Sequence, residues 1–302
     1  MSAITQQPAG HEPSGLEPIG DDGARATSVR RRTRRSTTLT IGLILVGVIV
    51  ATAVVSLVWL PYQPGDTSGG RLEPPGSAHW LGTDKLGRDL LAQLMIGARI
   101  ALAVGLGSVV IGAVIGILIG LVAAFATAWL DDTISAALDI LIAFPTLLLA
   151  MLIVAAQGAS LGSAILAIGL AMSAVVARLT RVLAKRILSQ QYVTAARTSG
   201  TSWPGIVRQH VLPNIWPTLS VSLALQFGVA VLAEASLSYL GLGAPPPNAS
   251  WGRLLQEAQG TVATAPVGAI APGVALVILV VGVNLVADGL RDVADPTRRR
   301  SR

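Results

Sequence analysis

The sequence contains no cysteine, only three histidines and few charged residues. Asp, Glu, Lys and Arg make up 13% of its 302 residues, against about a quarter in a typical soluble domain. Without cysteine the chain can form no disulfide, thiolate metal site or cysteine nucleophile. His11, His79 and His210 lie in separate segments, and neither an HExxH nor a GxxxxGK[ST] motif occurs. We therefore expect that this chain is not an enzyme and binds no metal or cofactor itself.

Long apolar runs take the place of the missing charge. Hydrophobic residues make up 52% of the chain, and its mean hydropathy is +0.65. A helix that crosses the hydrocarbon core needs roughly 20 predominantly apolar residues. The sequence predicts an all-α polytopic membrane protein with six transmembrane helices, near residues 39–60, 100–126, 134–156, 162–182, 213–236 and 268–290.

Lysine and arginine are distributed unevenly between the segments that join these spans. With the N-terminus in the cytoplasm, 17 of the 22 fall in inner segments, and the other 5 are Arg71, Lys85, Arg88, Arg99 and Arg253. A bias of this size predicts a multi-pass protein of the plasma membrane with both termini cytoplasmic.

Two basic segments flank residues 39–290. We expect residues 39–290 to form the transmembrane domain and to contact lipid. Residues 1–38, rich in Pro, Gly, Ser and charge, are predicted to form a disordered cytoplasmic arm, and residues 291–302 a basic cytoplasmic tail. The run RRRTRR at 30–35 is of a kind that can bind phosphate backbones. Directly before a first span it is typical of a topology signal, so we expect no nucleic-acid partner.

Three polar side chains fall within the predicted spans. Asp139 lies about a turn inside the cytoplasmic end of the third span, Glu234 lies at the outer end of the fifth, and Asn284 lies in the sixth. Ionisable groups in a membrane usually face protein or water. The two acids could reach the headgroups or pair at a subunit contact, or they could line a transport pathway. Asn284 could hydrogen-bond between helices.

Small residues recur in the second span. Gly112, Gly116 and Gly120 are four residues apart and share one helix face, so they predict close packing against another helix.

The outer segments contain a second set of candidates. Asp84, Lys85, Arg88 and Asp89 alternate in sign along an expected short helix, which could be a solvated face or an outer docking rim or gate. In the other outer segment, three prolines at 245–247 precede Trp251, which we expect near the membrane interface.

The segment 183–212 is the only predicted cytoplasmic loop of substantial size between two spans. Its residues 192–198 are good helix formers, and Gly200 can end such a helix in a left-handed conformation. Ala196 and Gly200 are four apart and would share a face with almost no side chain. Pro204 is expected to break the path, and Pro213 suits the first turn of the fifth span. Spacing alone favours a helical connector.

This loop resembles the EAA signature of importer-type ABC permeases, which reads EAA, three residues, Gly, nine residues, Ile, one residue, Leu-Pro. The positions match in register, with Thr194 in place of Glu and His210 in place of Ile. The retained residues are Ala195, Ala196, Gly200, Leu212 and Pro213.

Three further stretches are similar to the C-type permease of dipeptide, oligopeptide and nickel importers. They are HWLGTDKLGRDLLAQLMIGARIALAVG at 79–105, EASLSYLGLGAPPPNASWGRLL at 234–255 and VNLVADGLRDVADPTRRR at 283–300. The resemblance covers roughly residues 39–300 and implies the type I ABC importer permease fold.

The resemblance also implies partners. This chain would form half of a translocation pore with a B-type permease, above two cytoplasmic ATPase subunits that bind ATP and Mg, and below an extracytoplasmic substrate-binding protein. The loop at 183–212 would be the coupling helix, with a contact face that Gly200→Trp would fill. Dipeptides or short oligopeptides are the expected substrates, nickel complexes or other small solutes being alternatives. A stand-alone secondary transporter or channel is the alternative function.

Overall fold

A computed structural model describes residues 37–245 and 249–294, all within one unit that runs from Arg35 to Arg302. Most of the predicted arm at 1–38 and of the predicted tail at 291–302 lies outside the described residues. The described part is helical and contains no strand, so the all-α prediction is confirmed. The elements are α1 Thr37–Val58, α2 Leu90–Phe125, α3 Ala128–Ala143, α4 Thr146–Gln157, α5 Leu161–Leu188, α6 Gln191–Thr198, α7 Trp203–Ile206, a π-helical turn Val207–Val211, α8 Leu212–Tyr239, α9 Trp251–Ala258, a 3-10 turn Gln259–Thr261 and α10 Val267–Ala294.

Within the residues that the structure describes, five helical segments are long and apolar enough to cross a membrane, and α3 and α4 together make a sixth if they form one bent span. Their axes differ by 88°. The bend falls at Phe144 and Pro145, because proline has no N–H to donate and disfavours helical geometry in the residue before it. The sequence predicted a third span at 134–156 without this break.

Two helices extend beyond the segments that the sequence predicted. α2 begins at Leu90 rather than near residue 100, and a continuous helical path runs from Trp203 through the π-helical turn into α8. Pro204 lies in the first turn of α7, so the expectation that it breaks the path is wrong. Proline is tolerated there because the first N–H groups of a helix have no intrahelical partner.

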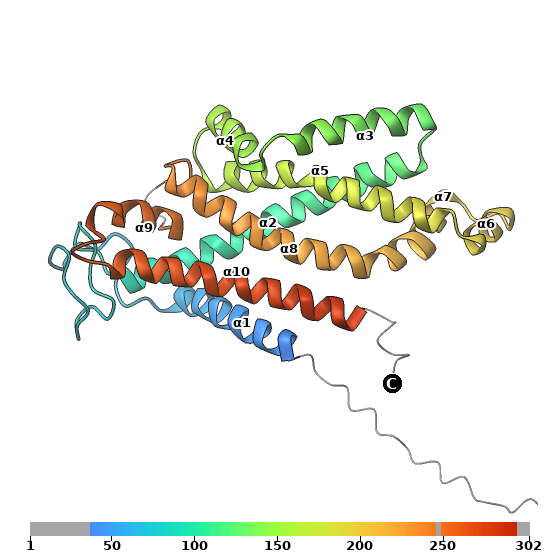
Figure 1. The fold of residues 1–302 in the computed structure, drawn as a ribbon. Coiled ribbons are helices and arrows are strands. Elements are labelled where there is room, and N and C mark those ends of the chain that lie inside the picture. Colours follow the sequence, from blue (N-terminus) through green and yellow to red (C-terminus); the bar gives the residue numbers. More distant parts are fainter. Residues whose placement is uncertain (1–36, 246–248, 295–302) are drawn as a thin grey trace, which may run out of the picture. The chain divides into compact units, whose positions relative to one another are not determined.

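α2 and α5 cross closely in the centre of the unit (Figure 1). A Cβ atom on Gly116 would lie 2.6 Å from the Cβ of Val176, and one on Gly120 would lie 2.5 Å from the carbonyl oxygen of Ala177. From the other side, a Cβ on Gly169 would lie 2.8 Å from Ile111. The predicted packing face is therefore confirmed, and its partner is α5.

This contact predicts the effect of one added methyl group. We expect Gly116→Ala to lower the free energy of unfolding by about 1–3 kcal/mol, because neither helix backbone can retreat without losing the rest of the interface. Gly47→Ala is the matched control, since a Cβ there meets nothing within 4 Å. Thermal unfolding of the detergent-purified protein measures both changes, and equal midpoints for the two variants would contradict the packing.

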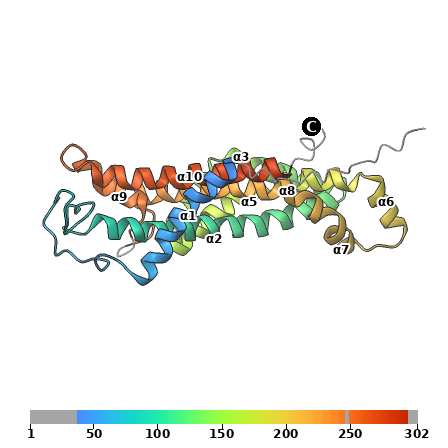
Figure 2. The same ribbon diagram turned by 90° about the horizontal axis from the view of Figure 1, so that it is seen from below.

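The candidates of the loop 183–212 and those of the outer segments lie at two opposite ends of the helices. α6 and α7 lie at one end, called the α6 end below, and α9 with residues 59–89 lies at the other, called the α9 end (Figures 1 and 2). α1 packs along α10, where a Cβ on Gly289 would lie 2.5 Å from Leu39. α2 runs between the two ends.

Candidate functional site

The segment between α5 and α8 forms the short helix α6, which ends at Gly200. Gly200 has φ +86°, and its N–H donates to Arg197 O while the Thr201 N–H donates to Ala196 O, both at 3.0 Å. These two bonds form a Schellman motif, which needs a left-handed residue at the position that glycine occupies. The predicted cap is confirmed.

The expectation that Ala196 and Gly200 share a helix face with almost no side chain is wrong. Gly200 follows the end of α6 and shares no helix face with Ala196, which is itself half-buried. Val193 turns inward and is fully buried. The exposed side of the helix instead presents Thr194 and Ala195, with Arg197 and Thr198 on the next turn.

Val193 fixes α6 to the remaining helices through a buried apolar cluster. Its other fully or almost fully buried members are Ala184, Ile206, Val211 and Ile215, and Leu212 packs against them. Pro213 lies in the first turn of α8, as predicted. The cluster therefore holds the short helix against α5, α7 and α8.

The cap makes a specific prediction for Gly200. We expect Gly200→Val to unravel the last turn of α6, because a branched side chain is costly at positive φ, by about 1–2 kcal/mol. Gly200→Asn should keep the turn, since asparagine tolerates this conformation. Hydrogen exchange of residues 191–201 measures the difference, and equal protection in the two variants would contradict it.

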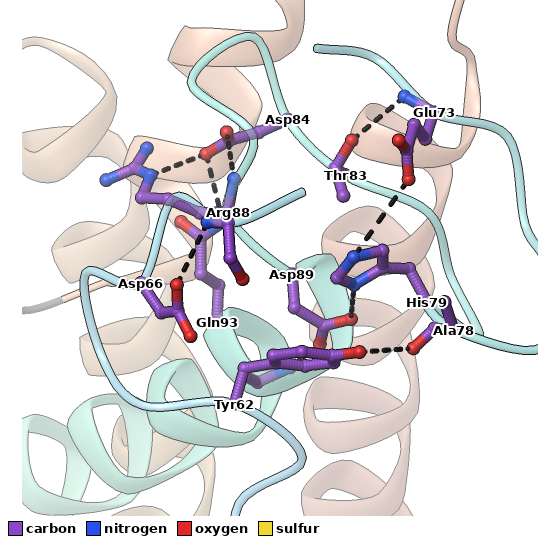
Figure 3. Close-up of polar contacts among 12 residues, drawn as sticks. Tyr62, Asp66, Glu73, Ala78, His79, Thr83, Asp84, Arg88, Asp89 and Gln93 are labelled. Carbon is purple, nitrogen blue, oxygen red and sulfur yellow. Dashed lines mark hydrogen bonds and ion pairs between the residues drawn. The ribbon is translucent and has the colours of Figure 1, made fainter. Parts of the chain in front are cut away.

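The α9 end contains a tight turn where a short helix was expected. Residues 83–89 form an isolated bridge between Thr83 and Asp89, and Gly87 has φ +80°. The Asp84 carboxylate is buried inside this turn. It accepts hydrogen bonds from Leu86 N at 2.8 Å, Arg88 Nε at 2.6 Å and Gln93 Nε2 at 3.0 Å (Figure 3). The expectation of a short helix with a solvated charged face is therefore wrong, although Lys85 is exposed.

These bonds lower the pKa of Asp84. Burial alone raises the pKa of this carboxyl, but hydrogen bonds from the Arg88 N–H, the Gln93 amide and the Leu86 N–H, with the charge of Arg88, outweigh it. The folded pKa is below the unfolded value, about 3.9. The ionised group therefore stabilises the turn above that pH, and this stabilisation is lost as the pH falls through the folded pKa.

We expect acid to open this turn in a way that depends on Asp84. Between about pH 5 and about pH 2, residues 59–89 should become susceptible to pepsin, because the protonated carboxyl holds the turn less strongly. Asp84→Asn should be less protected at the start and should show a smaller acid-dependent change. Superimposable cleavage profiles for the two proteins would contradict this assignment.

Asp89 joins the same loop to the start of α2. Its Oδ1 caps the helix by accepting from Ala92 N at 2.7 Å, and its Oδ2 lies 3.0 Å from His79 Nδ1 (Figure 3). Arg88 extends the network to α9, because its Nη2 donates to Glu257 Oε2 at 2.5 Å. The charged side chains therefore fasten three segments together.

Trp251 lies inside the protein rather than at the interface. Its side chain is 1% exposed, its Nε1 donates to Leu94 O at 2.9 Å, and a Cβ on Gly97 would lie 2.3 Å from its ring. Of the proposed docking or gate residues, Asp84, Asp89 and Trp251 are buried and Arg88 is partly buried. A cavity of about 500 Å³ lies nearby, and its lining includes Leu72, Pro74, Lys85, Leu254 and Val267.

The polar residues of the predicted spans lie apart from one another. Asp139 pairs with Arg178 at 3.0 Å, and both side chains are more than half exposed. Glu234 is buried and accepts a hydrogen bond from Ser238 Oγ at 2.6 Å. Asn284 is exposed on α10, and a Cβ on Gly228 of α8 would lie 3.7 Å from its Oδ1. In the part of the chain that the structure describes, no cluster of His, Asp and Glu is arranged to hold a metal.

A family model described as "Binding-protein-dependent transport system inner membrane component" matches residues 112–300. The chain belongs to this family. The permease is 34% identical to "Dipeptide transport system permease protein DppC" of Alkalihalophilus pseudofirmus, with 85% of this chain and 84% of that one covered. It is 38% identical to "Glutathione transport system permease protein GsiD" of Pectobacterium atrosepticum, with 74% of each covered.

Solved structures confirm the fold of the permease. It resembles a chain of the MetNI methionine ABC transporter in inward-facing conformations with a TM-score of 0.58 and 24% identity, covering 67% of the permease and 97% of that chain. The predicted ABC importer permease fold and the family resemblance are therefore confirmed. Membership in a family of transport subunits agrees with the expectation that the permease is not an enzyme, and does not favour a stand-alone transporter or channel.

One ionic cluster of the permease was missed in the sequence. Asp131, at the start of α3, accepts from Arg181 Nε at 2.5 Å and Nη2 at 2.7 Å, and from Lys185 Nζ. Its side chain is 6% exposed. Two cations on one face of α5, four residues apart at the end of a span, were interpreted only as a topology signal. The carboxylate of Asp131, at the start of α3, was the available indication of a partner.

Proposed function

We propose that the permease forms one half of the pore of an ATP-driven importer, with α6 as the contact for a cytoplasmic ATPase subunit. The observation that carries this proposal is the geometry of α6. It is a short helix at one end of the molecule, closed by the Gly200 cap and fixed by Val193, with a small residue, Ala195, on its exposed side. A second protein can approach such a helix closely.

The EAA-like register supports the same assignment. Thr194, Ala195 and Ala196 occupy α6, Gly200 caps it, and Leu212 and Pro213 open α8. The signature glutamate is replaced by Thr194, which is exposed. A hydroxyl can exchange hydrogen bonds with a partner but cannot form an ion pair, so the contact would rest on close packing more than on charge.

The partners follow from the family. A B-type permease would complete the pore as a heterodimer, two ATPase subunits would bind ATP and Mg at the α6 end, and an extracytoplasmic binding protein would dock at the α9 end. In this arrangement both termini would be cytoplasmic and the permease would lie in the plasma membrane. The binding protein would meet the 500 Å³ cavity at the α9 end, whose lining includes Lys85.

Peptides are the proposed substrates. One relative is named for dipeptide transport and another for glutathione transport, and glutathione is itself a tripeptide. A dipeptide or short oligopeptide fits both names. The binding protein would make the first selection among them.

We infer that α6 transmits the motion of the ATPase subunits to the helices of the permease. Closure of the two ATPase subunits on ATP would displace α6, and the helices attached to it would alternate between inward-open and outward-open arrangements. A ligand shifts such an equilibrium only through unequal affinity for the two states. ATP would supply that difference by binding to the closed ATPase pair.

Co-purification through a tag on the C-terminus tests this function. We expect a second permease and an ATPase to elute with the chain, and the complex, reconstituted with its binding protein, to take up a labelled dipeptide only with ATP. A chain that elutes alone and transports solute without ATP would refute the proposal.

A further inference from the structure

We propose that Trp203 and Phe125 join α6 to α2, so that α2 carries the movement of α6 across the permease to the α9 end. This inference rests on the proposed function, since it concerns how the ATPase contact is transmitted. The EAA-like loop connects α5 to α8 along the chain. α2 is remote from that loop in sequence, and only the fold brings them together.

A chain of three side chains makes the junction. The guanidinium carbon of Arg197, on α6, lies 4.3 Å from the centre of the Trp203 ring. Trp203, the first residue of α7, packs edge-on against Phe125, the last residue of α2, with ring centres 4.8 Å apart and planes 79° apart. Both separations fall within the usual range for cation–π and edge-to-face aromatic pairs.

Buried apolar side chains support the same junction between α6, α7 and α2. Val193 of α6 and Ile206 of α7 are fully buried in one cluster. Leu121, Ala124 and Phe125 of α2 are partly buried and pack against this cluster. Movement of α6 away from this cluster would expose the buried Val193. The two elements are therefore expected to move as one body.

The path from α6 into α8 is less regular. It passes through the π-helical turn Val207–Val211, and Pro217 follows inside α8. A π-helical turn and an internal proline each interrupt the regular hydrogen bonding of a helix, so this path can bend. α2 contains no proline and runs unbroken from Leu90 to Phe125.

The far end of α2 lies within the polar network of the α9 end. Asp89 caps its first turn, and Gln93 donates to Asp84, which also binds Arg88. Arg88 in turn binds Glu257 of α9. A displacement of α2 along or about its axis would thus reach the loop 59–89 and α9 directly. The first residues of α2 thus join the outer network, and its last residue contacts α7.

The first test measures the ratio of solute molecules taken up to ATP molecules hydrolysed by the assembled importer. We expect Trp203→Ala to retain the ATPase and its hydrolysis but to lower this ratio about tenfold, and Trp203→Phe to keep most of it. Trp216→Ala is the matched control, a tryptophan exposed on α8. Loss of ATPase binding in Trp203→Ala, or an unchanged ratio, would overturn the inference.

A double substitution tests whether the two rings act together. Phe125→Ala should lower the ratio as Trp203→Ala does, and the double variant should be no worse than either single variant. Multiplied losses would overturn the inference, because independent effects add in free energy. If the wild-type complex shows no ATP-dependent uptake, the proposed function fails before any variant is compared, so the two failures are distinguishable.

The absence of cysteine allows a direct distance measurement. Spin labels on Gln191→Cys and Thr127→Cys, both at exposed positions, report the separation of α6 from the end of α2. This distance should stay the same between nucleotide-free and ATP-bound complexes of the wild-type background and should become nucleotide-dependent with Trp203→Ala. A nucleotide-dependent change with Trp203 intact would overturn the inference.

Discussion

The Ala195→Trp variant should insert into the membrane normally and lose ATP-dependent uptake by at least tenfold. Ala195 lies on the exposed side of α6, next to Thr194 and opposite the buried Val193. An indole at this position would not disturb the apolar cluster beneath the helix. It would hold the ATPase surface away from α6. The van der Waals attraction between two packed surfaces falls steeply when such a gap separates them.

Co-purification of the ATPase and uptake into proteoliposomes measure this effect. Ala137→Trp, a matched alanine exposed on α3, should retain the ATPase. This comparison separates a block at α6 from general intolerance of an added indole. Full uptake by Ala195→Trp would remove α6 as the ATPase contact.

Asp131→Asn should cause the largest loss of stability among the charged residues described. The carboxylate is buried and holds both Arg181 and Lys185. Removing its charge leaves Arg181 and Lys185 without the carboxylate that both cations bind directly. Breaking a buried ion pair from one side costs roughly 3–5 kcal/mol, and the partial exposure of Lys185 favours the lower end of that range.

The matched control is Asp139→Asn on the same helix. Its pair with Arg178 is exposed on both sides, and such pairs contribute about 0–1 kcal/mol. The thermal midpoint of the purified protein should therefore fall by several degrees for Asp131→Asn and barely change for Asp139→Asn. Equal midpoints would mean that the Asp131 cluster does not hold α3 against α5.

Hydropathy and glycine spacing were sufficient to predict much of the fold. The apolar runs predicted helices where helices are found, and the four-residue spacing of Gly112, Gly116 and Gly120 predicted a close helix contact. The spacing could not identify α5 as the partner, because any helix with small residues would fit. The early start of α2 was missed because Gln93 and Arg99 make its first turns polar. Arg99 is accommodated by donating to Ser56 of α1.

The site was predicted in part. The short helix and the Gly200 cap follow from local chemistry, which a sequence displays. The turn at 83–89 does not, because alternating charges suit a helix surface as well as a turn that folds around Asp84. Pairs such as Asp131 with Arg181, and Trp203 with Phe125, join residues far apart in the chain and depend on how the helices cross.

The most direct test of the ATPase contact is a photo-crosslink from position 195. With a benzophenone side chain there, and with the same group at Ala263 near the α9 end as a control, the assembled importer is irradiated and its adducts are identified by mass spectrometry. We expect position 195 to capture an ATPase subunit and position 263 to capture none. Capture of the ATPase from position 263 but not from position 195 would contradict both the contact and the proposed orientation.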